Sequence, residues 1–184
     1  MANLLSVDFE IVDNQIIEIG IYDVNKQRTY QSLVRPTKSQ CLSDYFWSEF
    51  NRLNTELDWK LTEKDLKTAP QAHEVVNQIY KEFGADNDWF AWGQDNVVIK
   101  QLHHEVYKNT PLIPERFFNF GFIYHQFTGL TKKTSLSTVF EKEFNYSMAW
   151  HRALPDAIAC GDLYQKLRDI NQTLYKTNNL SGIQ

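Results

Sequence analysis

Two acidic residues near the N-terminus form a pattern that could bind a cation. Asp8 and Glu10 flank Phe9 in the segment Leu4–Glu10, which is typical of a β-strand. Alternate residues of a strand face the same side, so both carboxylates leave the sheet together and Phe9 points into the core. Two like charges this close are costly on an apolar strand unless a cation compensates them. The pattern predicts either a metal site or a strand end where both acids are solvated.

A histidine and an acid form a second pattern. His151 precedes Asp156 by five residues, and Pro155 places Asp156 in the first turn of a helix. The helix dipole alone would favour an acid there, and a histidine at such a place is commonly bonded to backbone. The spacing would also let both side chains reach one cavity, where a histidine could exchange a proton near neutral pH.

Asp95 follows the end of a short aromatic strand, Asp88–Trp92, and opens a helix. Capping of that helix would explain it fully. Its place at the carboxyl end of a central strand also allows it to join the acids of the other two segments. Four carboxylates together suit Mg²⁺ or Mn²⁺, and a pair of such ions is a common device for hydrolysing a phosphodiester.

The elements that must position these residues follow from periodicity and turn residues. Strands are expected at 4–10, 15–24, 28–34, 88–92 and 117–120, and helices at 44–53, 61–66, 70–83, 95–107, 121–127, 135–144 and 155–170. Three neighbouring antiparallel strands followed by helices that alternate with short strands predict an α/β domain with a mixed sheet. We expect one domain over 1–184, with 171–184 as a frayed polar tail.

Composition limits the class of protein. The 184 residues are 42% apolar and 23% charged, as in globular domains, and the net charge is −4. This balance does not favour a nucleic-acid binder, although bound metal or local cations could serve a small site. Cys41 and Cys160 form no CxxC motif, which argues against a disulfide scaffold and favours a reducing cytoplasm. The N-terminus lacks a signal peptide, and no stretch predicts a membrane span.

Together the motifs resemble the DEDDh nucleases, which are DnaQ-like 3′–5′ exonucleases of the ribonuclease H-like superfamily. The resemblance covers positions 4 to about 170 and rests on DFE at 8–10, QIIEIG at 15–20, WGQD at 92–95 and HRALPDA at 151–157. The histidine five residues before the last acid marks the histidine branch of the family. The WGQD form and the LTEKDLKTAP run at 61–70 are similar to the ERI-1-like and KapD-like subgroup.

The resemblance implies a ribonuclease H-like fold, two divalent ions and a division of roles. Asp8 would bridge the two ions, Glu10 and Asp156 would complete the shell of one, and Asp95 would hold the other. His151 would act as the general base on an attacking water. The chain would remove nucleoside 5′-monophosphates from the 3′ end of single-stranded RNA or DNA, or of short oligonucleotides.

Substrate contacts are expected beside the metal site. Phe9, Ile11, Trp92 and Arg152 occupy the positions that such contacts would use, and Ile11 departs from the small residue common in the family. Trp47, Phe50 and Trp92 could stack on a base, although core packing is the more common fate for at least two of them.

Two other classes of function remain open from the sequence. One is a catalytically silent module that binds nucleic acid or protein on the same fold, and the other is an unrelated α/β enzyme such as a phosphatase. The sequence also does not distinguish a monomer from a homodimer or from a subunit of a larger assembly.

Overall fold

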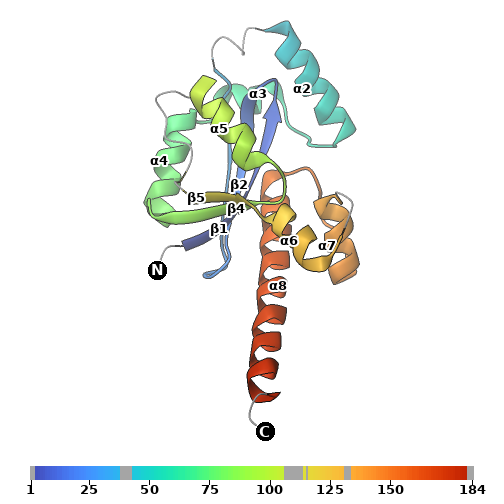
Figure 1. Cartoon of the computed structure of the whole chain (residues 1–184). Coiled ribbons are helices and arrows are strands. Elements are labelled where there is room, and N and C mark those ends of the chain that lie inside the picture. The colour runs from blue at the N-terminus through green and yellow to red at the C-terminus, as the bar shows by residue number, and fades with distance from the viewer. Residues whose placement is uncertain (1–2, 38–42, 106–113, 115, 131–133, 182–184) are drawn as a thin grey trace.

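The structure, a computed structural model, describes residues 3–37, 43–105, 114, 116–130 and 134–181, with the side chains of all but 103–105 and 173–181. A five-stranded sheet lies between layers of helices (Figure 1). The elements are β1 (Asn3–Val12), β2 (Gln15–Asp23), β3 (Arg28–Leu33), α2 (Asp44–Glu56), α3 (Glu63–Thr68), α4 (Ala72–Phe83), β4 (Asn87–Ala91), α5 (Asp95–Glu105), β5 (Arg116–Asn119), α6 (Phe120–Thr128), α7 (Leu136–Phe144) and α8 (Ala153–Ser181).

The sheet has the strand order β3-β2-β1-β4-β5. The pairs β1–β2 and β2–β3 are antiparallel, whereas β1–β4 and β4–β5 are parallel. The predicted mixed sheet, with three antiparallel strands followed by parallel ones, is therefore confirmed. Because β1 lies in the middle of this order, both of its faces are available to the helices.

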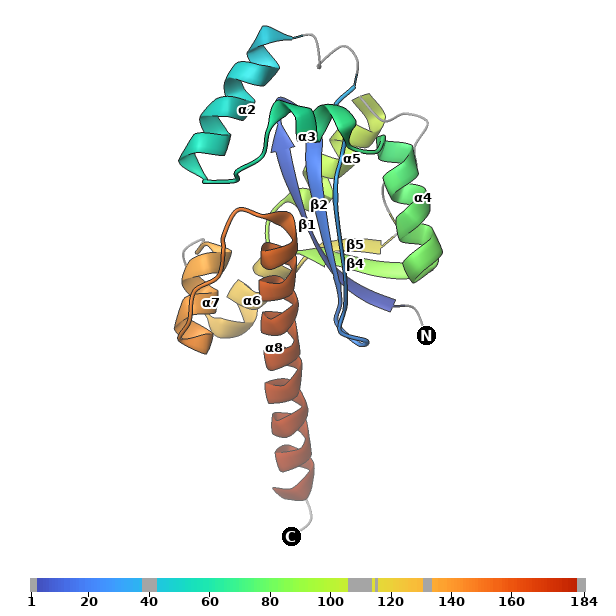
Figure 2. The ribbon, with the colours of Figure 1, turned by 180° about the vertical axis from the view of Figure 1, so that it is seen from behind.

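Each face of the sheet packs against its own helices (Figures 1 and 2). The face with Leu5, Val7 and Phe9 packs against apolar side chains of α4 and α5. The opposite face packs against α6, α7 and α8, where the core includes Phe90, Phe140 and other buried residues. The alternation along β1 therefore leaves Ser6, Asp8 and Glu10 on the side of α8, as period-two patterning predicts.

A third apolar cluster lies beyond the strand ends, beneath α2 and α3. Phe46 and Phe50 of α2 are fully buried against Val12 and Ile17. Trp47 packs edge-on against both phenylalanines, at ring-centroid distances of 4.9 and 5.7 Å. Phe50 is therefore a core residue, and the base-stacking alternative for it is wrong.

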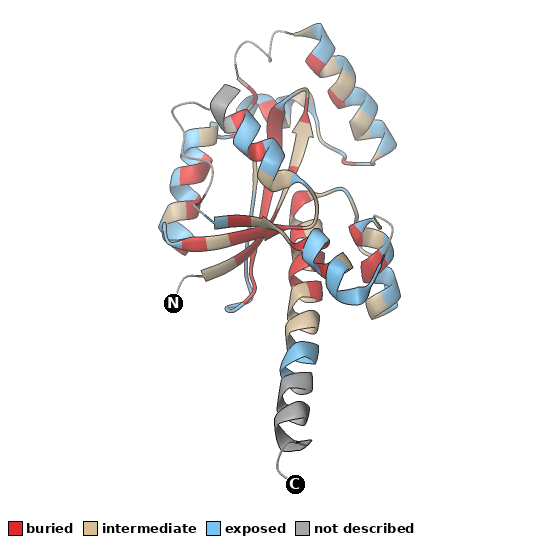
Figure 3. Ribbon diagram, viewed as in Figure 1, coloured by how far each residue is buried: buried red, intermediate tan, exposed pale blue. Residues whose placement is uncertain are grey.

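Helix α8 docks on β1 and β2 through small residues. A Cβ on Gly20 would lie 2.2 Å from the backbone of Ala153, and one on Gly161 would lie 2.4 Å from the ring of Tyr22. Among the side chains of α8 that the structure describes, the buried ones lie where the helix crosses the sheet (Figure 3). No side chain larger than hydrogen fits at Gly20, so this glycine sets how closely α8 approaches β2.

The end of α8 differs from the prediction. The helix continues to Ser181, beyond the expected end at Ile170, and extends past the sheet (Figures 1 and 2). Between Ile170 and Ser181 the sequence contains neither Gly nor Pro, so no residue there stops a helix. Within α8, Cys160 is a buried free cysteine. Cys41 and the last two positions of the helix expected at 95–107 lie outside the described residues.

Replacing Gly20 with Ala should destabilise the protein by at least about 2 kcal/mol, because the new methyl group meets backbone that cannot rotate away. Urea unfolding followed by circular dichroism measures this change. The control is Gly129→Asn: position 129 has left-handed backbone and open space around its Cβ, so Asn should cost less than about 1 kcal/mol. Equal losses in the two variants would contradict the close approach of α8.

Candidate functional site

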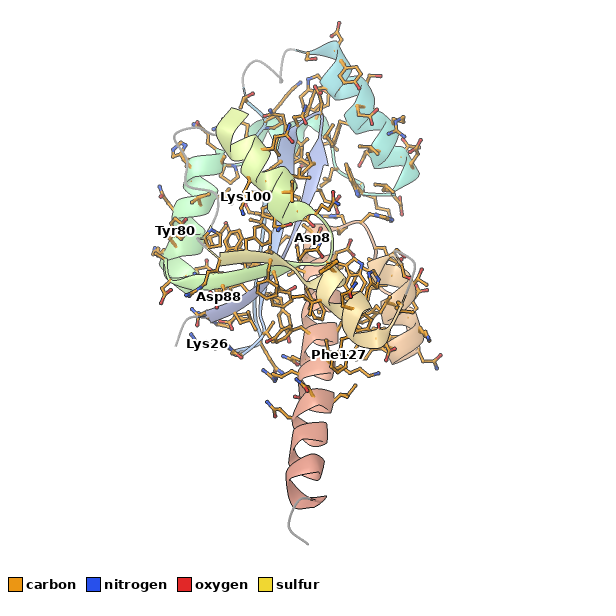
Figure 4. The ribbon with its side chains drawn as sticks, in the orientation of Figure 1. Asp8, Lys26, Tyr80, Asp88, Lys100 and Phe127 are labelled. Carbon is orange, nitrogen blue, oxygen red and sulfur yellow. The ribbon has the colours of Figure 1, made fainter. Side chains whose placement is uncertain are left out.

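Three of the four predicted acids converge where the sheet meets the start of α8. Asp8, Glu10 and Asp156 each offer a carboxylate oxygen, and these oxygens lie within 4.8 Å of one another. Asp8 and Glu10 share one face of β1, and Asp156 lies in the first turn of α8, directly opposite. Figure 4 shows Asp8 at the centre of the molecule, between the sheet and the surrounding helices.

Burial and mutual repulsion raise the pKa values of these acids. Burial, followed by the neighbouring charges of Asp156 and Glu18, raises the pKa of Glu10 from 4.5 to about 8. Burial also raises the pKa of Asp156 to about 7 and that of Asp8 well above its usual value, and the charge of Asp95 adds to both. A group of carboxylates that resists ionisation in this way is one that a cation would stabilise.

Asp156 also has an oxygen with no protein partner. Its Oδ2 accepts a hydrogen bond of 3.3 Å from the backbone N–H of His151. Its Oδ1 is buried and lacks a hydrogen-bond partner among the described residues. A buried carboxylate oxygen without a donor is costly unless an ion or water occupies the space before it. The oxygen-only donor set fits a hard divalent cation such as Mg²⁺ or Mn²⁺.

Asp95 lies at the edge of this cluster. It is the first residue of α5, and its carboxylate accepts hydrogen bonds from backbone groups of Gly93 and of Asp95 itself. It is not part of the group of oxygens within 4.8 Å, yet its charge acts on Asp8, Glu10 and Asp156. The charge of Asp95 therefore acts on the cluster, while its carboxylate bonds backbone groups at the start of α5.

His151 lies on the approach to α8 in an uncommon backbone conformation. Its φ of 62° falls in the left-handed region, and its side chain is exposed to solvent. The preceding residue, Trp150, is fixed by hydrogen bonds from its indole N–H to Glu141 Oε1 and Ser147 Oγ, at 2.9 and 3.1 Å. Left-handed backbone in a residue other than glycine persists only where neighbouring contacts hold it, and it is common at functional sites.

One residue of this site, Glu18, is absent from the sequence predictions. It lies on β2 opposite Glu10, is 1% exposed, and accepts two hydrogen bonds from the guanidinium of Arg152. A charged residue within the apolar run QIIEIG is the signal that could have found it, because buried acids are rare unless they are paired. Arg152, for which substrate contact stays a prediction, directs its guanidinium to Glu18 and to the carbonyl of Trp59.

The other expected substrate contacts lie around the acids. The ring of Phe9 packs in the core against Trp89, as predicted, so only its backbone borders the site. Ile11 is partly buried at the point where the β1–β2 register shifts. Trp92 is partly buried against Phe120 and lines a pocket of about 380 Å³ next to Gly93 and Gln94.

Comparison with solved structures finds the same architecture. The nuclease domain of 3'hExo, described as a DEDDh family member bound to rAMP, superposes with a TM-score of 0.66 at 19% identity, covering 90% of this chain and 92% of that one. This chain has the fold of a DEDDh nuclease domain. A full-length 3'-exonuclease has a TM-score of 0.62 at 19% identity, covering 92% of this chain and 63% of that one. No protein-family model and no curated protein matches the sequence.

This similarity confirms the predicted ribonuclease H-like fold. The carboxylates of Asp8 and Glu10 belong to β1, and that of Asp156 belongs to α8. Within the described ranges, no helix combines the length and the hydropathy needed to cross a bilayer.

Metal-free protein should lose thermal stability as the pH rises from about 5 to about 8. In the folded chain Glu10 and Asp156 have pKa values of about 8 and about 7, whereas in the unfolded chain both acids ionise at lower pH. Rising pH therefore removes protons from the unfolded chain before the folded one, which lowers the free energy of unfolding. The midpoint of thermal unfolding, measured in chelator across this range, checks the direction. Mn²⁺ should restore the lost stability most strongly at pH 8, since cation binding needs the ionised acids.

Asp8→Asn should flatten this pH dependence, because it removes an acid whose own pKa is raised by burial and by the charges of Asp95, Asp156 and Glu10. Asp86→Asn is the matched control, since Asp86 is an exposed acid outside the cluster and its side chain is paired with Arg116. A fall of equal size in wild type and in Asp8→Asn would contradict the electrostatic account of the site.

Proposed function

We propose that this protein is a metal-dependent 3′–5′ exonuclease that acts on the 3′ end of single-stranded RNA or DNA and releases nucleoside 5′-monophosphates. The observation that carries the proposal is the cluster of Asp8, Glu10 and Asp156, whose oxygens lie within 4.8 Å of one another on a DEDDh nuclease fold. Repelling, buried carboxylates have no structural benefit of their own, whereas a phosphodiester hydrolase needs them to hold cations.

The four acids would hold two divalent ions, Mg²⁺ or Mn²⁺. By the resemblance to DEDDh nucleases, Asp8 would contact both, Glu10 and Asp156 would complete one shell, and Asp95 would serve the other. Such ions, when bound, supply an acidic water and compensate charge at the attacked phosphate. A bound ion would also explain why the buried Oδ1 of Asp156 has no hydrogen-bond donor among the described residues.

His151 would remove the proton from the attacking water. Its exposed side chain can accept that proton and pass it to solvent, and its backbone is tied to Asp156 by the N–H to Oδ2 hydrogen bond. Imidazole is the side chain that most often serves as a general base in enzymes that work at neutral pH.

The 3′-terminal nucleotide would enter beside Trp92. The pocket of about 380 Å³ that Trp92, Gln94 and Phe122 help to line has room for a base, and it adjoins Asp95 along the chain. The backbone of Phe9 and the side chain of Ile11 would border the opposite side. The related 3'hExo nuclease domain is bound to rAMP, which supports a nucleotide ligand for this fold.

Incubation of 5′-labelled single-stranded RNA and DNA of matched sequence with Mg²⁺ or Mn²⁺ tests the proposal. We expect a ladder that shortens from the 3′ end, with nucleoside 5′-monophosphates as products. Asp8→Ala should abolish the ladder while the variant remains folded, because removal of one clustered charge relieves repulsion. Asp86→Ala, which lies outside the cluster, is the control and should match wild type.

If neither polymer nor di- and trinucleotides are cleaved, the chain is a binding module that has kept the fold. Cleavage of small phosphomonoesters alone would indicate a phosphatase. Activity retained in Asp8→Ala would overturn the metal assignment.

His151→Ala should lower turnover by about 100-fold or more at neutral pH, the usual contribution of a positioned general base. Mn²⁺ binding, measured by calorimetry, should survive, because His151 contributes no ligand to the carboxylate group. An unchanged pH–rate profile in this variant would rule out the general-base role.

A further inference from the structure

A buried ion pair joins β2 to the segment that carries His151 and Asp156. The carboxylate of Glu18 accepts hydrogen bonds from Nε and Nη2 of Arg152, at 2.9 and 2.6 Å, in a bidentate contact. The Glu18 side chain is 1% exposed and that of Arg152 is 30% exposed. Such a pair is separated by 134 positions in the sequence, so it fixes two distant parts of the chain against each other.

Every oxygen of Glu18 has more than one donor. Oε1 also accepts from the side-chain amide of Gln31 at 2.7 Å, and Oε2 also accepts from the backbone N–H of Ala153 at 3.3 Å. Ala153 is the first residue of α8, so Glu18 binds the N-terminus of that helix as well as the side chain before it. A carboxylate with four donors has a single orientation, which it imposes on its partners.

The pair acts on the site through chain connectivity. Arg152 lies between His151 and the first turn of α8, where Asp156 accepts the N–H of His151. Its third contact, from Nη1 to the carbonyl of Trp59 at 3.4 Å, anchors it to the segment between α2 and α3. The left-handed backbone of His151 is therefore followed directly by Arg152, whose guanidinium is held by three hydrogen bonds.

We propose that Glu18 and Arg152 are positioning residues: their ion pair sets the places of His151 and Asp156 relative to Asp8 and Glu10. This inference rests on the proposed nuclease function and adds residues to it. It also assigns the guanidinium of Arg152 to Glu18 rather than to a substrate phosphate.

Asp23 provides a matched control on the same strand. Its side chain is also fully buried, it pairs with Arg28 at 3.0 Å, and it accepts backbone N–H groups of Asn25 and Lys26. It lies at the hairpin end of β2, away from the acids of the site. Loss of either carboxylate charge should cost stability. The charge of Glu18 also acts directly on Glu10 and Asp156, so Arg152→Lys, which keeps both charges of the pair, isolates the positioning role.

The test compares Glu18→Gln, Arg152→Lys and Asp23→Asn with wild type. Glu18→Gln removes the charge, and Arg152→Lys keeps the charge but cannot make the two-pronged contact. We expect kcat on single-stranded oligonucleotide to fall by about 10- to 100-fold in both, as for groups that orient metal ligands, with KM changed by less than about 3-fold. Mn²⁺ binding, measured by calorimetry, should weaken in both. Asp23→Asn should lower only the thermal unfolding midpoint.

Three other results are informative. If Glu18→Gln loses only thermal stability, like Asp23→Asn, the ion pair is structural and the inference is overturned, while the nuclease function stands. If Arg152→Lys raises KM and leaves kcat unchanged, Arg152 contacts substrate and the inference is overturned. If wild type cleaves no oligonucleotide, the proposed function fails, and the Mn²⁺ affinities of Arg152→Lys and Asp23→Asn still decide whether the pair positions Asp156. If Glu18→Gln does not fold, Arg152→Lys alone tests the inference, because its partly exposed side chain makes unfolding less of a risk.

Discussion

Repulsion among half-buried carboxylates is the constraint on which the rest of this structure depends. Asp8, Glu10 and Asp156 come within 4.8 Å of one another through their oxygens, and each has a raised pKa. The interactions that hold these acids close together do not involve the acids themselves. Small residues let α8 approach the sheet, and the apolar faces of β1, β4 and the helices supply the free energy. This repulsion lowers stability locally, and on the proposed function a bound cation would recover it.

The alternation of residues along β1 and the starts of α5 and α8 could be predicted from local rules. Strand period two puts Asp8 and Glu10 on one face, and helix starts place Asp95 and Asp156 at the ends that face the strands. The order of strands and helices then restricts the fold to a mixed α/β sheet. Each of these features depends on residues that are close together in the chain, so periodicity and turn residues suffice to predict it.

The pairing of Glu18 with Arg152 could not be predicted, because it joins residues 134 positions apart and depends on the exact docking of α8. The cluster of Phe46, Phe50 and Trp59 was equally hard to predict, since an aromatic residue on such a helix can meet either a core or a ligand. The end of α8 differs for another reason. Apolar periodicity stops near Ile170 and so predicts a helix end there, but no helix-breaking residue follows before Ser181.

The site unites the first strand with the last helix, and this has a consequence for protein synthesis. Asp8 and Glu10 leave the ribosome early, whereas Asp156 follows about 150 residues later. At common translation rates of about 5–20 residues per second, β1 waits on the order of ten seconds for the helix that completes the cluster. A nascent or truncated chain that lacks α8 therefore has no assembled centre. Hydrolytic capacity, on the proposed function, would arise only after the start of α8 has been synthesised and has docked on the sheet.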